Sequence, residues 1–170
     1  MLKGKNVSLR IVEKEDLPLW TEWANDPKLL GEYLRLRQSS KTDLEKQYDK
    51  SPPEAKSFFI EKKDGTKVGG ILHFLVGELM EIGYALIPSE RGKGYCTEAA
   101  MIIVDYLFLS RDIVRIQAHT DVRNVASQKV LEKAGFKREG VIRKSMFIRG
   151  EWRNTYLFSI LREEWKEPKI

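Results

Sequence analysis

The spacing of hydrophobic residues along the chain predicts a series of strands and helices. Near the start, Val7, Leu9 and Ile11 alternate with polar residues, which is typical of a strand with one buried face. Between two later stretches that resemble strands, Asp64-Gly65 is a typical hairpin turn. The expected strands are 7–11, 57–62, 67–76, 81–87, 114–120, 136–147 and 152–161.

Helical spacing and helix-end signals fill the intervals between these strands. Asp16 and Asn124 stand where an N-cap is expected, and Gly135 follows the last turn of a helix. The expected helices are 17–25, a short one beginning within 39–43, 96–109 and 125–134. The strand 81–87 alternates little, which indicates a central strand covered on both faces. This order predicts an α+β fold with a mixed sheet.

Length and composition favour one domain with a mildly basic surface. The chain has 170 residues, 42% of them hydrophobic, which is enough to form a core. No repeat, low-complexity segment or linker interrupts it, so we expect a single domain over residues 1–170. The 30 Lys and Arg outnumber the 25 Asp and Glu, for a net charge of +5. Because these charges are dispersed, a nucleic-acid-binding domain is disfavoured.

Several functional classes are disfavoured by the residue types and segments that the sequence lacks. Cys96 is the single cysteine, so an intrachain disulfide and a cysteine-ligated zinc site are excluded. His73 and His119 lie in expected strands without a ligand partner at suitable spacing. We interpret both as core or edge residues, and we expect no metal. No apolar stretch approaches the ~20 residues of a membrane helix and no signal peptide is recognised, so we expect a cytoplasmic protein without membrane contact.

The segment Arg91-Gly92-Lys93-Gly94 lies between an expected strand and an expected helix. Its glycines allow a ligand to approach the backbone, and the first amides of the helix point the same way as the positive end of the helix dipole. Arg91 and Lys93 add positive charge. These features suit a pyrophosphate, but the glycines equally suit a tight turn that binds nothing. The spacing matches neither a P-loop nor a Rossmann fingerprint.

A second segment, residues 124–136, also leads from a strand into a helix. Asn124 is a natural N-cap, and Ser127 lies one turn into the helix, where simple capping would also explain both residues. By these two segments together, the chain resembles the GNAT superfamily of acetyl-CoA-dependent N-acetyltransferases, in particular its RimJ/RimL-like branch. The resemblance rests on Glu81-Ile82-Gly83-Tyr84, Arg91-Gly92-Lys93-Gly94-Tyr95, Arg123-Asn124-Val125-Ala126-Ser127, Leu131-Glu132-Lys133 with Gly135-Phe136, and Gly150-Glu151-Trp152.

The resemblance implies a GNAT-type fold and a place for acetyl-CoA. The fold would be a mixed, mostly antiparallel sheet of about seven strands with flanking helices, splayed between its fourth and fifth strands, 81–87 and 114–120. The pantetheine arm of acetyl-CoA would enter this gap and pair with the first of these strands. The segment from Arg91 to Gly94, which we call the glycine loop, would hold the pyrophosphate. The cofactor-binding residues would be Leu86, Ile87, Arg91, Gly92, Lys93, Gly94, Tyr95, Cys96, Thr97, Asn124 and Ser127.

The resemblance also implies direct attack of a primary amine on the thioester. Glu81 is the first candidate for the base that removes the amine proton, although a strand-end carboxylate can equally pair with a lysine. Ser127 would lie near the sulfur as the remaining hydroxyl, because Leu131 stands where some members carry a tyrosine acid. Two further departures are Ser89, where many members have Gln or Arg, and Asn154, where the branch often has Asp.

The predicted function is acetyl-CoA-dependent N-acetylation, without a metal. The first candidate acceptor is the N-terminal amine of a ribosomal or other protein. The alternatives are a small amine, such as a polyamine, an amino acid or an aminoglycoside, or a non-catalytic acyl-CoA sensor on the same fold. No nucleic acid and no membrane is expected as a partner, and a homodimer is left open.

Overall fold

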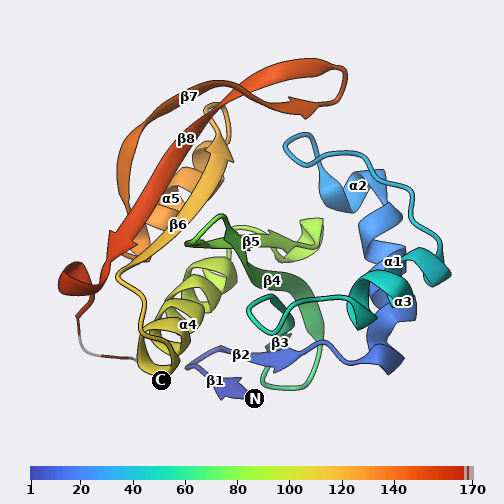
Figure 1. Ribbon diagram of the computed structural model, residues 1–170. Helices are drawn as coiled ribbons and strands as arrows, with labels where there is room; N and C mark the ends of the chain where they lie inside the picture. Colours follow the sequence, from blue (N-terminus) through green and yellow to red (C-terminus); the bar gives the residue numbers. More distant parts are fainter. Residues whose placement is uncertain (167, 169–170) are drawn as a thin grey trace.

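A computed structural model of the chain describes residues 1–166 and 168. Its centre is an eight-stranded sheet in the order β1-β2-β3-β4-β5-β6-β8-β7 (Figure 1). All neighbouring strands are antiparallel except β5 and β6, which are parallel. The strands are β1 (Leu2–Lys3), β2 (Val7–Ile11), β3 (Lys56–Lys62), β4 (Lys67–Val76), β5 (Leu79–Leu86), β6 (Arg115–Asp121), β7 (Lys137–Ile148) and β8 (Glu151–Leu161).

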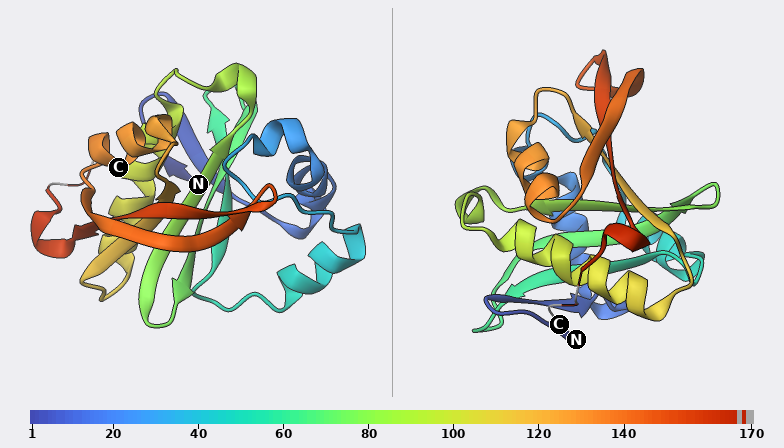
Figure 2. Two further views of the ribbon diagram at one scale, coloured as in Figure 1. Left: turned by 90° about the horizontal axis from the view of Figure 1, so that it is seen from above. Right: turned by 90° about the vertical axis from the view of Figure 1, so that its left-hand side faces the viewer.

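Helices cover both faces of the sheet, with α4 and α5 on one face and α1 to α3 on the other (Figures 1 and 2). The helices are α1 (Leu17–Asn25), α2 (Pro27–Leu30), α3 (Lys41–Asp49), α4 (Tyr95–Ser110) and α5 (Val125–Lys133). Short 3-10 turns cover Lys14–Asp16, Pro88–Glu90 and Arg162–Glu164. No helix among the described residues is long and apolar enough to cross a membrane.

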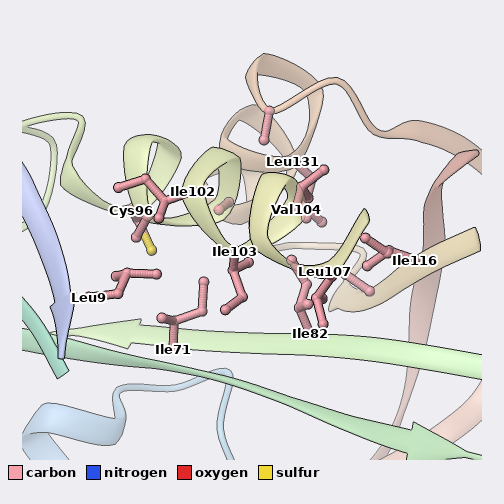
Figure 3. Close-up of a cluster of buried hydrophobic side chains, with 14 of the residues drawn as sticks. Leu9, Ile71, Ile82, Cys96, Ile102, Ile103, Val104, Leu107, Ile116 and Leu131 are labelled. Carbon is pink, nitrogen blue, oxygen red and sulfur yellow. The ribbon is translucent and has the colours of Figure 1, made fainter. Parts of the chain in front are cut away.

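The main core lies between α4 and the sheet. Cys96, Ile103 and Leu107 of α4 point toward Ile71 of β4 and Ile82 of β5 (Figure 3). Since α4 carries buried side chains on most of its surface, it is the central helix of the fold, and this burial of apolar surface stabilises the fold.

A smaller cluster secures α1 on the opposite face. Trp20 and Trp23 lie one turn apart and both make edge contacts with the buried ring of Phe59, at centroid distances of 5.2 and 5.5 Å. Both tryptophans are partly buried and pack against this cluster. Gly70 is required beneath them, because a Cβ there would lie 2.6 Å from the Trp20 ring.

The sheet is splayed between β5 and β6, as expected. The two strands pair only at Met80 with Ile116 and at Glu81 with Gln117. Beyond Glu81, β5 continues to Leu86 on the β4 side alone, and β6 diverges with β8 and β7 (Figures 1 and 2). Residues 82–86 of β5 therefore present a strand edge without a neighbouring strand among the described residues.

The expected sequence of elements is confirmed, with three corrections. The sheet has eight strands rather than about seven, because the two-residue β1 pairs with β2. The short helix α2 follows α1 directly, with Asp26 as its N-cap. Asp16 does not cap α1 through its side chain, because its carboxylate instead accepts two hydrogen bonds from Arg10.

The outer hairpin of β7 and β8 contains a bulge. Between Ile142 and Met146 of β7 the register with β8 shifts. Lys144 takes a positive φ of 48° there, and its amide donates to Oδ1 of Asn154 at 2.9 Å. Asn154, the departure from the RimJ/RimL-like pattern, is therefore a structural residue that holds this bulge.

Candidate active site

The glycine loop has the open geometry that a bound anion requires. Gly92 and Gly94 take φ values of 78° and 85°, which favour glycine over any other residue. A Cβ at either position would meet nothing within 4 Å, so the face of the loop is free of protein atoms. Gly94 also begins α4, whose first amides have no partner inside the helix. Tyr95, Cys96 and Thr97 lie in that first turn, as expected.

The two basic side chains of the loop are held by the protein. Arg91 donates from Nε to the carbonyl of Leu86 at 3.1 Å and from Nη2 to the carbonyl of Leu29 at 2.8 Å. Lys93 forms an ion pair with Glu90 at 3.0 Å. Arg91 thus connects the loop to α2, a role that the sequence did not indicate. The groups of the loop that have no protein partner inside the helix are therefore the first backbone amides of α4.

Cys96 is a packing residue. Its side chain is buried in the main core, and this burial raises the pKa of the thiol to about 12. The thiol therefore stays protonated at neutral pH, which excludes it as a nucleophile there.

Ser127 and Tyr84 lie on the two sides of the splay. Oδ1 of Asn124 accepts from the Ser127 amide at 3.1 Å, so Asn124 is the expected N-cap of α5. The Ser127 hydroxyl is 2.9 Å from that of Tyr84 on β5. Burial raises the pKa of the Tyr84 hydroxyl well above its ordinary value, so it remains a donor at neutral pH. Leu131, one turn further along α5, is fully buried in the core and offers no hydroxyl.

Glu81 lies at the point where β5 and β6 separate. Its Oε2 accepts from Nε2 of Gln117 at 3.0 Å and lies 3.0 Å from Nδ1 of His119. The partners that the structure gives Glu81 are therefore these two groups of β6, whereas the alternative interpretation pairs it with a lysine. His119 lies in β6 and is partly buried, and its contact with the Glu81 carboxylate is one that the sequence alone did not indicate. By contrast, His73 is a core residue, as expected.

A segment formed by residues 27–33, which we call the α2 segment, lies over the open end of the splay. Four of its carbonyls accept hydrogen bonds from arginines of distant elements. The donors are Arg91 to Leu29, Arg149 to Pro27 and Gly31, and Arg153 to Glu32. The segment therefore connects the glycine loop with the β7–β8 hairpin. No periodicity or motif in the sequence signals these contacts.

Asp121, at the end of β6, organises the same region. Its side chain is only 1% exposed and pairs with Arg123 and Arg153. Burial alone would raise its pKa, but the hydrogen bonds from these two arginines outweigh that effect and hold the pKa of Asp121 below its ordinary value. The hydroxyl of Tyr33 donates to the carbonyl of Arg123 at 3.2 Å, so the α2 segment also contacts the loop that follows β6.

The chain matches the acetyltransferase (GNAT) domain family over residues 6–137, which is more than half of its length. The chain belongs to this GNAT family. It is an acyltransferase enzyme, and its splayed sheet and glycine loop are where the RimJ/RimL-like resemblance places them.

Two curated GNAT relatives align with nearly the whole chain. YjcK of Bacillus subtilis (strain 168), named as a probable N-acetyltransferase, is 33% identical, covering 96% of this chain and 98% of its own. The spermidine N(1)-acetyltransferase of Escherichia coli (strain K12) is 26% identical, covering 97% of this chain and 91% of its own.

Solved GNAT structures share the fold. Spermidine N-acetyltransferase from Vibrio cholerae, in complex with CoA and spermine, superposes with a TM-score of 0.84 at 22% identity, covering 94% of this chain and 97% of its own. RimL, a ribosomal L7/L12 alpha-N-protein acetyltransferase in complex with coenzyme A, superposes with a TM-score of 0.81 at 18% identity, covering 94% of this chain and 97% of its own. At these identities the likeness extends to the fold alone.

Proposed function

We propose that this GNAT enzyme transfers the acetyl group of acetyl-CoA to a primary amine by direct attack. The observation that carries the proposal is the unpaired edge of β5 beyond Glu81, which leads directly to the open glycine loop. An extended pantetheine arm can complete such an edge as an added strand. The loop amides then suit the pyrophosphate, since both glycines leave their face open.

Each candidate site residue has a role in this proposal. The backbone of Leu86 and Ile87 contacts the pantetheine arm where it leaves the gap between β5 and β6. The amides from Gly92 to Thr97 bind the pyrophosphate. Asn124 keeps the first turn of α5 in place, so that Ser127 faces the gap from the other side. Acetyl-CoA supplies the thioester, whose carbonyl the amine attacks.

Groups on the two sides of the gap between β5 and β6 take the proton from the amine and give one to the thiolate. An amine acceptor is an ammonium ion at neutral pH and must lose a proton before it can attack. Glu81, buried at the start of the splay, supplies the negative charge that draws this proton, directly or through a neighbour. Ser127, held by Tyr84, is placed to protonate the departing thiolate.

The charges beside the α2 segment favour a protein N-terminus over a polyamine as the acceptor. A polyamine carries several positive charges and needs carboxylates that are free to receive them. Asp121 and Glu151 are already paired with arginines, and Glu81 is in contact with His119. The segment 31–38 itself carries Arg35 and Arg37 against one carboxylate, Glu32. Because the Escherichia coli relative is a spermidine N(1)-acetyltransferase, a polyamine is the second candidate for the acceptor.

The test is release of free thiol from acetyl-CoA by the full-length protein. The acceptor panel contains peptides with free N-termini, matched N-terminally blocked peptides, spermidine and single amino acids. We expect turnover with free but not with blocked peptides, and weaker turnover with spermidine. Preference for spermidine would move the assignment to the second candidate. CoA binding without turnover on any amine would contradict the transferase and support a sensor.

A further inference from the structure

We propose that His119 is the group that takes the proton from the acceptor amine, with Glu81 and Gln117 as the residues that position it. This inference rests on the proposed acetyl transfer and names its base. It begins from the contact between Nδ1 of His119 and Oε2 of Glu81, at 3.0 Å, between two strands that are about to separate.

The contact fixes which ring nitrogen is free. A carboxylate is an acceptor, so the imidazole nitrogen that faces it must carry hydrogen. In the neutral ring the proton is then on Nδ1, and Nε2 keeps the lone pair that a base needs. Gln117 donates to the same Glu81 oxygen at 3.0 Å, which limits the movement of the carboxylate.

The place of His119 on its strand exposes it to the gap. Gln117 is opposite Glu81 in the last paired position of β5 and β6. His119 lies two residues further along β6, on the same face, where β5 no longer accompanies the strand. Its side chain is 16% exposed, against 10% for Glu81. The imidazole is therefore the more exposed of the two groups, and in this proposal it faces the acceptor and returns its proton to solvent.

Among the charged groups on the strands around the His119 imidazole, Glu81 is the one that contacts it. On β6, Asp121 is neutralised by Arg123 and Arg153, and Arg115 is paired with Glu139 of β7. On β8, the residues opposite His119 and Gln117 are Leu157 and Ser159, which carry no charge. On β4, the uncharged Phe74 is opposite Glu81. A protonated His119 is therefore stabilised chiefly by the Glu81 carboxylate.

The step balances without any further reagent. One ammonium proton passes to Nε2 of His119, and the amine nitrogen bonds to the acetyl carbon as the carbon–sulfur bond breaks. The second proton lost by the nitrogen passes to the thiolate through Ser127. His119 then releases its proton to solvent, so the products are the amide, CoA and one proton.

His119→Asn is the decisive variant, because the asparagine amide can replace Nδ1 as a donor to Glu81 while Nε2 is lost. We expect kcat to fall by about 100-fold or more, within the range of a general base, with the affinity for acetyl-CoA unchanged. The rise of kcat/KM from acid to neutral pH should disappear. Glu81→Gln should retain more activity than His119→Asn. If His119→Asn keeps more than a third of wild-type kcat and the same pH profile, His119 only positions Glu81, and the proposal is wrong.

A second measurement does not depend on turnover. The chain has only two histidines, so nitrogen NMR of the labelled protein gives two imidazole spectra, and His119→Asn assigns them. We expect neutral His119 to carry its proton on Nδ1 and to lose this preference in Glu81→Gln, while His73 is unchanged. A proton on Nε2 would overturn the proposal even if the enzyme is active. Failure of the wild-type protein to acetylate any amine would instead contradict the proposed function.

Discussion

The hydroxyl of Tyr84 lies 2.9 Å from that of Ser127, so a side-chain contact joins β5 to the first turn of α5 beyond the point where β5 and β6 have separated. Because the Tyr84 hydroxyl keeps its proton, it can fix the direction of the Ser127 hydroxyl. This contact restricts the rotation of the Ser127 hydroxyl, which the proposed mechanism uses as the proton donor to the thiolate.

Removal of either hydroxyl should slow thiol release. We expect Ser127→Ala to lower kcat by about tenfold, less than a typical general acid contributes, because a thiolate leaves readily. Tyr84→Phe should lower kcat by a smaller factor, and the double variant should match Ser127→Ala, since both act through one group. Steady-state kinetics at saturating acetyl-CoA measures this. Additive losses in the double variant would show that the two hydroxyls act independently.

Substitution of Gly92 by Asp should abolish acetyl-CoA binding. The side chain would occupy the open face of the loop with a negative charge, at a φ of 78° that disfavours any side chain. We expect the Kd from calorimetry to rise at least ~100-fold, given the charge of a pyrophosphate. Gly92→Ala tests the backbone strain alone, and Gly77→Asp places the same substitution at a φ of 61° in a distant turn. Unchanged affinity in Gly92→Asp would remove the loop from the binding site.

The α2 segment should influence the acceptor more than the cofactor. Arg149→Ala removes the donor to the carbonyls of Pro27 and Gly31, which weakens the attachment of the segment to the hairpin, where Arg153 still donates to Glu32. We expect KM for the amine to rise by roughly fivefold, about 1 kcal/mol, with KM for acetyl-CoA unchanged. Arg143→Ala, an exposed arginine of the same hairpin, is the matched control. An equal rise in both constants would mean that the segment supports the whole site.

His73 should make the fold sensitive to mild acid. It is fully buried between the rings of Phe58 and Tyr106, and burial lowers its pKa from 6.5 to about 4. The unfolded chain therefore takes up a proton at His73 below pH 6.5 that the folded protein refuses. Stability from this group is complete above pH 6.5 and falls as pH decreases toward 4, by about 3 kcal/mol.

Chemical denaturation at pH 7 and pH 4.5 measures this effect. His73→Phe, which keeps an aromatic ring in an aromatic site, should lose less stability between these two pH values than the wild-type protein. An identical loss in both proteins would show that the acid sensitivity comes from the paired carboxylates alone.

The elements with strong local signals were predictable. The helix α4 follows from its long apolar stretch, and the open glycine loop follows from two glycines before a helix. Asn124 as an N-cap is confirmed, because capping depends on a residue three positions away. Asp16 failed as a cap for a tertiary reason, since Arg10 on a neighbouring strand binds its carboxylate.

What could not be predicted depends on pairs far apart in the sequence. Glu81 and His119 meet only because β5 and β6 are neighbours in the sheet, and no local pattern encodes that contact. The contacts of the α2 segment are similar, because an arginine that donates to a distant carbonyl leaves no periodicity. The short elements β1 and α2 were missed because two and four residues carry too little pattern.

The bulge at Lys144 has a consequence for solubility. β7 is the outermost strand of the sheet, twelve residues long, and its free edge could template a strand from another molecule. The shifted register and the left-handed Lys144, held by Asn154, interrupt that edge near its middle and place charged side chains there. By holding this bulge, Asn154 keeps the edge of β7 irregular, which disfavours its pairing with a strand of another molecule.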